Sequence, residues 1–278
     1  MKILSKNTLA ALAVVVMTAT GAGNATASEL KVEKQEWTFA GPFGYFDDAQ
    51  LQRGFQIYKE VCSACHGLSR VAFRNLGDKG ALGYSEDQIK ALAAEYEVTD
   101  AQPDEEGEMF DRAAKPFDYF PSPFANDNAA RASNSGALPP DLSLMAKSRA
   151  VGRGFPLFIV DAFTMYQEHG PDYLYGLLTG YESDEPNDDG KYISHGYLGK
   201  DGIIAMAPPL ADETVEYTDG TPATLEQHSK DVISFLMWTA EPKLEERKQL
   251  GFKVILFLIL FAGLLYLTKR KVWANIEH

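Results

Sequence analysis

The chain has 278 residues, 45% of them hydrophobic, and carries 39 acidic against 26 basic side chains. This length is sufficient for one substantial domain with a hydrophobic core. The formal net charge of −13 argues against a nucleic-acid-binding protein and favours a basic soluble partner, although acidic loops that only keep a domain soluble would give the same charge.

The first 27 residues have the features of an export signal. Two lysines precede nine consecutive apolar residues, Leu9 to Met17, and Ala25-Thr26-Ala27 offers a cleavage site between small side chains. Nine apolar residues are fewer than the ~20 that cross a bilayer, which disfavours an uncleaved anchor. We therefore expect residues 1–27 to be a bacterial-type signal peptide and the mature chain to begin near Ser28.

A helix is predicted from about residue 48 up to the first cysteine. Asp48 can cap its start, and the apolar residues Leu51, Phe55, Tyr58 and Cys62 recur at the spacing of one helix face. This helix leads directly into the next motif and would hold it against a packed core.

The stretch Cys62-Ser63-Ala64-Cys65-His66 has the spacing that attaches a c-type haem. Each of the two thiols can form a thioether with a vinyl group of the porphyrin, and the histidine can bind the iron. A zinc ribbon would need two further cysteines, and the chain has none. The main alternative is a redox dithiol, which would be expected near a βαβ pattern that the sequence does not show.

Met206 is the strongest candidate for the second axial ligand. It lies in the apolar segment Ile203 to Pro209, where two prolines disfavour a helix and reduce the entropic cost of holding the sulfur in place. A thioether ligand also raises the reduction potential relative to two histidines. Among the histidines, His195 is the main alternative. The other methionines of the mature chain lie among charges (Met109) or on predicted helices (Met145, Met165, Met237).

A second clear helix is predicted near the end of the domain. Thr224-Leu225-Glu226-Gln227 resembles a capping box, and the helix would end before Pro242. Gly- and Pro-rich stretches separate the two helices, and we find no convincing alternating strands. We therefore expect a mostly α, loop-rich fold. The residues on the buried face of this helix would be Val232, Phe235, Leu236 and Thr239.

The C-terminal segment is predicted to cross a membrane. Leu250 to Thr268 would form about 28 Å of helix, close to the ~30 Å hydrocarbon thickness, and Lys253 in its first turn can reach the interface. The cluster Lys269-Arg270-Lys271 places the C-terminus in the cytoplasm by the positive-inside rule. The expected divisions are a periplasmic domain (28–248), a transmembrane anchor (249–269) and a cytoplasmic tail (270–278), in a bacterial inner membrane.

Several segments together point to one family. They are Arg53–Tyr58 leading into Cys62–His66, Gly136–Ser143, Tyr173–Tyr181, Met206–Leu210 and Asp231–Pro242, followed by the apolar C-terminal segment. In this combination and order the chain resembles the cytochrome c1 family, the haem subunit of the cytochrome bc1 complex, in its bacterial form. The resemblance implies a cytochrome c-like helical haem domain with loop insertions and one C-terminal transmembrane helix.

The resemblance also implies roles for individual residues. Cys62 and Cys65 would bind one haem c covalently, with His66 and Met206 as axial ligands. Near this haem, Pro140 would pack on the His66 side, Arg149 would bind a propionate, and Tyr173 can also reach a propionate.

The regions 103–135 and 181–200 resemble the family least. Some bacterial relatives carry an extra cysteine pair in such insertions. This chain has no such pair, so packing would have to stiffen both regions.

The function implied is electron transfer without catalytic residues in this chain, as a redox subunit of ubiquinol–cytochrome c reductase. The partners implied are cytochrome b, the Rieske iron–sulfur subunit as electron donor and a soluble or membrane-tethered cytochrome c as acceptor, in a dimeric complex on the lipid bilayer. One alternative is a stand-alone, membrane-anchored electron shuttle. Another is a haem enzyme such as a peroxidase, whose iron would keep an open position for a reactant.

Overall fold

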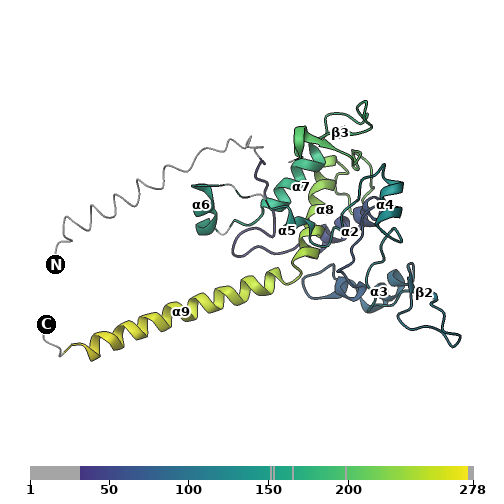
Figure 1. Cartoon of the computed structure of the whole chain (residues 1–278). Helices are drawn as coiled ribbons and strands as arrows, with labels where there is room; N and C mark the ends of the chain where they lie inside the picture. The colour runs from purple at the N-terminus through teal and green to yellow at the C-terminus, as the bar shows by residue number, and fades with distance from the viewer. Residues whose placement is uncertain (1–31, 151, 153, 165, 198, 275–278) are drawn as a thin grey trace. The chain divides into compact units, whose positions relative to one another are not determined.

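The computed structural model describes residues 32–150, 152, 154–164, 166–197 and 199–274. Its regular structure is mostly helical, which confirms the predicted fold class (Figure 1). The predicted signal peptide, residues 1–27, lies outside the described residues, as does the end of the predicted tail. The α-helices are α2 (Asp48–Glu60), α3 (Glu86–Ala93), α4 (Asp127–Ser133), α5 (Met145–Ser148), α6 (Leu157–Thr164), α7 (His169–Thr179), α8 (Leu225–Ala240) and α9 (Leu244–Val272). The 3₁₀ turns are η2 (Cys62–Ala64), η3 (Phe73–Gly77) and η4 (Lys200–Gly202), and the strands are β1 (Glu97–Thr99), β2 (Asp111–Ala113), β3 (Tyr192–Ile193) and β4 (Ile203–Ile204).

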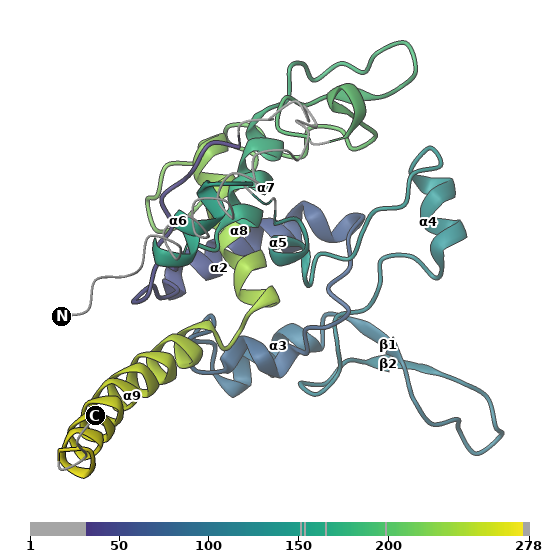
Figure 2. The same cartoon turned by 60° about the vertical axis from the view of Figure 1, so that its left-hand side comes forward.

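Helices α2 and α8 pack directly against one another, and α8 also contacts α5 and α7 (Figure 2). The closest approach is at Gly54. A Cβ atom at this position would lie 2.1 Å from the carbonyl oxygen of Asp231 and 2.7 Å from the Cβ of Phe235. No real side chain tolerates such distances, so the crossing of the two helices requires glycine at position 54.

Aromatic side chains fill the space beside this crossing. The ring of Phe235 lies 5.5 Å from that of Phe55 and 5.9 Å from that of Tyr58, and it stacks on Trp238 at 5.8 Å. All four side chains are buried. Such aromatic contacts contribute large buried areas to the core.

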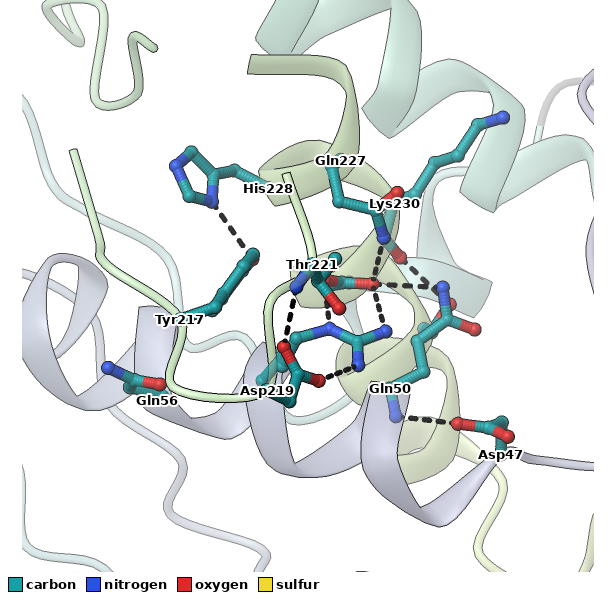
Figure 3. Close-up of polar contacts among 12 residues, drawn as sticks. Asp47, Gln50, Gln56, Tyr217, Asp219, Thr221, Gln227, His228 and Lys230 are labelled. Atoms are coloured by element: carbon teal, nitrogen blue, oxygen red, sulfur yellow. Dashed lines mark hydrogen bonds and ion pairs between the residues drawn. The ribbon is translucent and has the colours of Figure 1, made fainter. Parts of the chain in front are cut away.

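A buried carboxylate, that of Asp231, also lies between α2 and α8. Arg53 Nε donates to one carboxylate oxygen at 2.8 Å. Gln50 and Gln227 donate to the other, at 3.0 and 2.8 Å (Figure 3). A buried charge is tolerated only when it is paired and hydrogen-bonded, and here both conditions are met. Arg53 extends the network outward through a 2.7 Å ion pair with Asp219.

The predicted helix ends are correct except in one detail. The N-cap of α2 is Asp47 and not Asp48, because the Asp47 carboxylate accepts from the backbone N–H of Gln50 at 2.7 Å. The predicted cap at Thr224 is confirmed, since its hydroxyl accepts from the N–H of Gln227 at 3.3 Å. The side chains predicted for the inner face of α8 are all buried.

The region 103–135 is held by charge as well as by packing. Antiparallel strands β1 and β2 carry it away from the core, and Phe73 N and Arg74 N donate to carbonyls of the returning chain. Arg112 donates to Asp118 at 2.6 and 3.0 Å and to Asp100 at 2.5 Å. The expectation that packing alone stiffens this region was therefore incomplete.

The region 181–200 folds back onto α7. The hydroxyl of Ser194 donates to the carbonyl of Leu177 at 3.0 Å, and β3 pairs with β4. A Cβ at Gly196 would lie 1.9 Å from the carbonyl oxygen of Gly176, so the two backbones are in direct contact. This contact fixes the start of the segment that leads to Met206.

Helix α9 has the length and composition of a membrane span. Its most apolar 18-residue window has a mean hydropathy of 2.4, and none of that window is buried within the protein. The helix begins at Leu244, earlier than the predicted anchor, and Leu244 itself is buried in the domain core. The first turns of α9 therefore belong to the domain, and the exposed apolar part follows them.

We expect Gly54→Ala to destabilise the folded domain by about 1–3 kcal/mol, because the added methyl group forces α2 away from α8. The measurement is denaturant unfolding followed by circular dichroism. Gly263→Ala is the matched control, since a Cβ at that position has open space around it. Equal stability of the two variants would contradict the required close approach.

We expect the β1–β2 hairpin to lose protection from hydrogen exchange as the pH falls below about 4. The Arg112 guanidinium holds the pKa of Asp118 below its ordinary value. The stabilisation from this pair is therefore complete above the ordinary carboxyl pKa and is lost as the pH falls through the lowered one.

Arg112→Gln should lower the protection of the hairpin already at neutral pH and remove the acid transition. Arg74→Gln, at an exposed position on η3, is the control and should leave both unchanged. An acid transition that persists in Arg112→Gln would exclude the ion pair as its cause.

Candidate functional site

The two cysteines and the histidine of the motif share one tight turn at the end of α2. The N–H groups of Cys65 and His66 both donate to the carbonyl of Cys62, at 3.1 and 2.9 Å. The hydroxyl of Tyr58, on the last turn of α2, donates to the carbonyl of His66 at 3.0 Å. Both cysteines are free thiols and are partly buried. Helix α2 thus positions the whole motif.

The imidazole of His66 is oriented by a second segment of the chain. Its Nδ1 lies 2.7 Å from the carbonyl oxygen of Pro140, and because a carbonyl can only accept, Nδ1 carries the proton. The unprotonated Nε2 is then the nitrogen that can bind a metal. Burial lowers the pKa of His66, with the Pro140 carbonyl and the Asp141 charge opposing it, so the ring stays neutral near pH 7.

The residues after Pro140 are hydrogen-bonded to the residues after His66. Leu142 N–H donates to the carbonyl of Gly67 at 2.9 Å, and the Asp141 carboxylate accepts from Ser69 N–H at 2.8 Å. Ser143 completes the contact, since its hydroxyl accepts from the backbone N–H of Arg70 at 3.1 Å. Burial acts to raise the pKa of Asp141, but hydrogen bonds from Ser143 and Ser69 outweigh it and the pKa is lowered.

Cys62 lacks the electrostatics of a reactive thiol. Burial raises the pKa of the Cys62 thiol to about 12, and the neighbouring Cys65 contributes in the same direction. Reactive dithiols instead lower a thiol pKa through nearby positive charge or a helix N-terminus. The site therefore favours the haem-attachment interpretation of the motif over the dithiol interpretation.

Met206 lies just after β4, on a segment that packs against the same hydrophobic core as Cys62. Its side chain is partly buried, and its carbonyl accepts from the hydroxyl of Tyr181 at 3.1 Å. Burial raises the pKa of Tyr181, and the nearby hydroxyl of Tyr173 adds to the effect. Tyr173 itself is buried on α7. Tyr181 therefore connects the Met206 segment to α7.

The other candidates lie in different surroundings. His195 is 74% exposed at its side chain, with Nε2 4.0 Å from the carboxylate of Glu182, which disfavours it as an axial ligand. Arg149 is exposed at the end of α5, where its N–H donates to the carbonyl of Met145. Met145 and Met237 are buried and Met109 is exposed, while Met165 lies outside the described residues.

The donor set fits a c-type haem. Two free thiols, a neutral imidazole with Nε2 available for a metal and a thioether on a fixed loop are the groups that such a haem requires. The structure brings His66 and Pro140 together through the hydrogen bond between Nδ1 and the Pro140 carbonyl.

Three supporting residues were not identified from the sequence. Tyr58 was assigned to an apolar helix face and to a matching segment, and Asp141 and Tyr181 were only parts of matching segments. The position of Tyr58 eight residues before His66, on a helix entering the motif, is a signal that could have suggested its role. The other two act across long sequence separations, which no local pattern reveals.

Comparisons with known proteins identify the family. The profile of the Cytochrome C1 family matches residues 37–276. A "Cytochrome c1" of Rhodospirillum rubrum is 44% identical, with 95% of each chain covered, and one of Blastochloris viridis is 47% identical, with 87% of this chain and 86% of that protein covered. A "Cytochrome b/c1" of Bradyrhizobium diazoefficiens is 55% identical over 86% of this chain, which spans 35% of that longer protein. The chain belongs to the cytochrome c1 family.

Proposed function

We propose that this chain is the membrane-anchored haem c subunit of a cytochrome bc1 complex, where it carries single electrons. The observation that carries the proposal is the Cys62–His66 turn with His66 Nδ1 held by the Pro140 carbonyl. It supplies two thiols for covalent attachment and one oriented imidazole. Membership of the cytochrome c1 family supports the same function.

Each residue of the site has a defined task in this proposal. Cys62 and Cys65 would form the thioethers, and His66 and Met206 would ligate the iron. The bound haem supplies an iron that gains and loses one electron. Ligation on both sides leaves no position for a reactant, which disfavours a peroxidase. Arg149 and Tyr173 are proposed to bind the propionates, with Pro140 packed on the His66 side.

The electron donor proposed is the Rieske iron–sulfur subunit, and the acceptor is a soluble or membrane-tethered cytochrome c. Residues 28–250 contain 38 acidic and 20 basic side chains, so a basic acceptor would be attracted over a long range. The name "Cytochrome b/c1" of the Bradyrhizobium relative supports cytochrome b as a neighbouring subunit. The complex is proposed to be a dimer in the bilayer.

The proposed topology places the haem domain in the periplasm of a bacterial inner membrane. The basic residues 269–271 end α9 and favour a cytoplasmic C-terminus. An export signal in residues 1–27 would give the same orientation. The divisions proposed are the signal peptide (1–27), the haem domain (28–248), the anchor (249–269) and the tail (270–278).

We expect Met206→Leu to retain covalent haem and to show a sharply lower reduction potential, because axial ligands set potentials over a range of about 0.8 V. The measurement is a redox titration followed by optical absorption. Met237→Leu, at a buried position on α8, is the control and should keep the original potential. An unchanged potential in Met206→Leu would exclude Met206 as a ligand.

The subunit assignment is tested by gentle solubilisation of membranes and purification of this chain. A b-type cytochrome and a Rieske protein should copurify with it, in stoichiometric amounts and with quinol–cytochrome c reductase activity. If the chain carries haem but migrates alone, the alternative of a stand-alone membrane-anchored shuttle replaces the complex.

A further inference from the structure

Residues 39–46, which precede α2, are hydrogen-bonded to the first turns of α9, and we call this segment the clasp. The backbone N–H of Phe46 donates to the Glu245 carboxylate at 2.8 Å, and Lys248 Nζ donates to the carbonyl of Phe39 at 2.5 Å. Phe39 is fully buried and stacks on Trp37 at 5.3 Å. The clasp therefore connects the domain core to the point where α9 leaves it.

A pocket of about 300 Å³ lies between this clasp and α9. The loop from Pro42 to Tyr45 forms one wall, and Phe43 meets Phe252 of α9 edge to face at 5.6 Å. The rings around the pocket are exposed: Phe43 is 74%, Tyr45 is 57% and Phe252 is 54% accessible. Phe43 and Tyr45 belong to the domain, and Phe252 belongs to α9. A cluster of exposed aromatic rings at one end of a domain is unusual unless something covers it.

The other walls of the pocket carry charge. Lys248 and Lys253 of α9 line it together with one acid, Glu245, whose carboxylate is already occupied by the N–H of Phe46. Lys253 is exposed and lies one turn beyond Gln249, within the first turns of the apolar part of α9. The side-chain charges lining the pocket thus sum to +1, and Lys253 is the most outward of the lysines.

The position of the pocket along α9 decides what can reach it. The apolar part of α9 starts at about Leu250, so the pocket lies where the helix would enter the membrane. At this depth a bilayer presents phosphate groups and glycerol, and aromatic rings and lysines are the side chains that favour it. Lysines near the surface attract the phosphate, while rings contact the glycerol and the first methylenes.

We propose that this pocket binds the headgroup of one membrane phospholipid from the leaflet on the side of the haem domain. Lys253 contacts the phosphate, and Lys248, already bound to the Phe39 carbonyl, adds its charge from the inner wall. Phe43 and Phe252 enclose the glycerol. The site is independent of the electron-transfer function and depends only on α9 crossing the membrane.

The test uses the full, haem-loaded protein with any copurifying subunits, carrying the substitution Phe43→p-benzoylphenylalanine and reconstituted into vesicles of phosphatidylglycerol and phosphatidylcholine. Irradiation should give a protein–phospholipid adduct, identified by mass spectrometry. Adding Lys253→Gln should reduce the adduct about fivefold, the effect of one lysine at a membrane surface. Excess inorganic phosphate should leave it unchanged.

Two controls accompany the experiment. The same photoreactive residue in place of Phe110, which is 42% exposed and directly precedes β2, should give no lipid adduct. Lys90→Gln, on α3, should leave the adduct at position 43 unchanged. An unaltered haem spectrum in every variant shows that a lost adduct does not reflect unfolding or loss of the haem site.

Three results would overturn the proposal. An adduct to another protein subunit would mean that a protein covers the pocket. An equal lipid adduct in Lys253→Gln would mean that the rings touch the bilayer without a headgroup site. Competition by inorganic phosphate would mean that the lysines bind free anions.

Discussion

The close contact between α2 and α8 is the constraint on which the rest of the domain depends. Because Gly54 has no side chain, the backbone of α2 reaches that of α8 at Asp231, and the aromatic core closes beside them. The buried carboxylate of Asp231 is satisfied only when Arg53, Gln50 and Gln227 arrive from both helices. The polar contacts fix the register of the two helices, while the apolar contacts supply most of the burial.

The position of the Cys62–His66 turn follows from this contact. Helix α2 ends two residues before Cys62, and Tyr58 links the helix to the carbonyl of His66. The imidazole ring itself is hydrogen-bonded to the Pro140 carbonyl, and the segment that carries this carbonyl is hydrogen-bonded to the residues after His66. The backbone of His66 and its ring are thus each held by a hydrogen bond, which favours a fixed geometry for the proposed ligand over adjustment on metal binding.

Local patterns in the sequence predicted a large part of this arrangement. Each of the patterns that succeeded involves residues close together in the sequence. They are the Cys-x-x-Cys-His spacing, the apolar face of α2, the cap at Thr224 and the apolar C-terminal helix. The predicted N-cap of α2, Asp48, differs by one residue from the observed N-cap, Asp47. Both side chains are capable of capping, and only the backbone conformation selects between them.

Contacts between distant segments could not be predicted. The bond from Tyr181 to the Met206 carbonyl and the hydrogen bond from Ser69 N–H to Asp141 join segments that are far apart in the sequence. The ion pair of Arg112 with Asp118 spans only six residues, but it depends on how this loop folds. In the last case the absence of extra cysteines suggested packing, whereas Arg112 also forms ion pairs with two carboxylates, those of Asp100 and Asp118. The sequence pattern of residues 103–135 does not distinguish Arg112 from an arginine that points into solvent without a partner.

Only residues 241–243 separate α8 from α9, and this short link leaves the membrane helix little freedom to swing. Glu241 in the link is bound by Lys147 at 2.7 Å and by Arg247, so one ion-pair cluster spans α5, the link and α9. A tilt of the anchor in the bilayer would therefore carry α8 with it. In the proposed function, the height of the haem above the lipid would then be set by this chain itself, and the movement between electron-transfer partners would fall to the subunits that approach it.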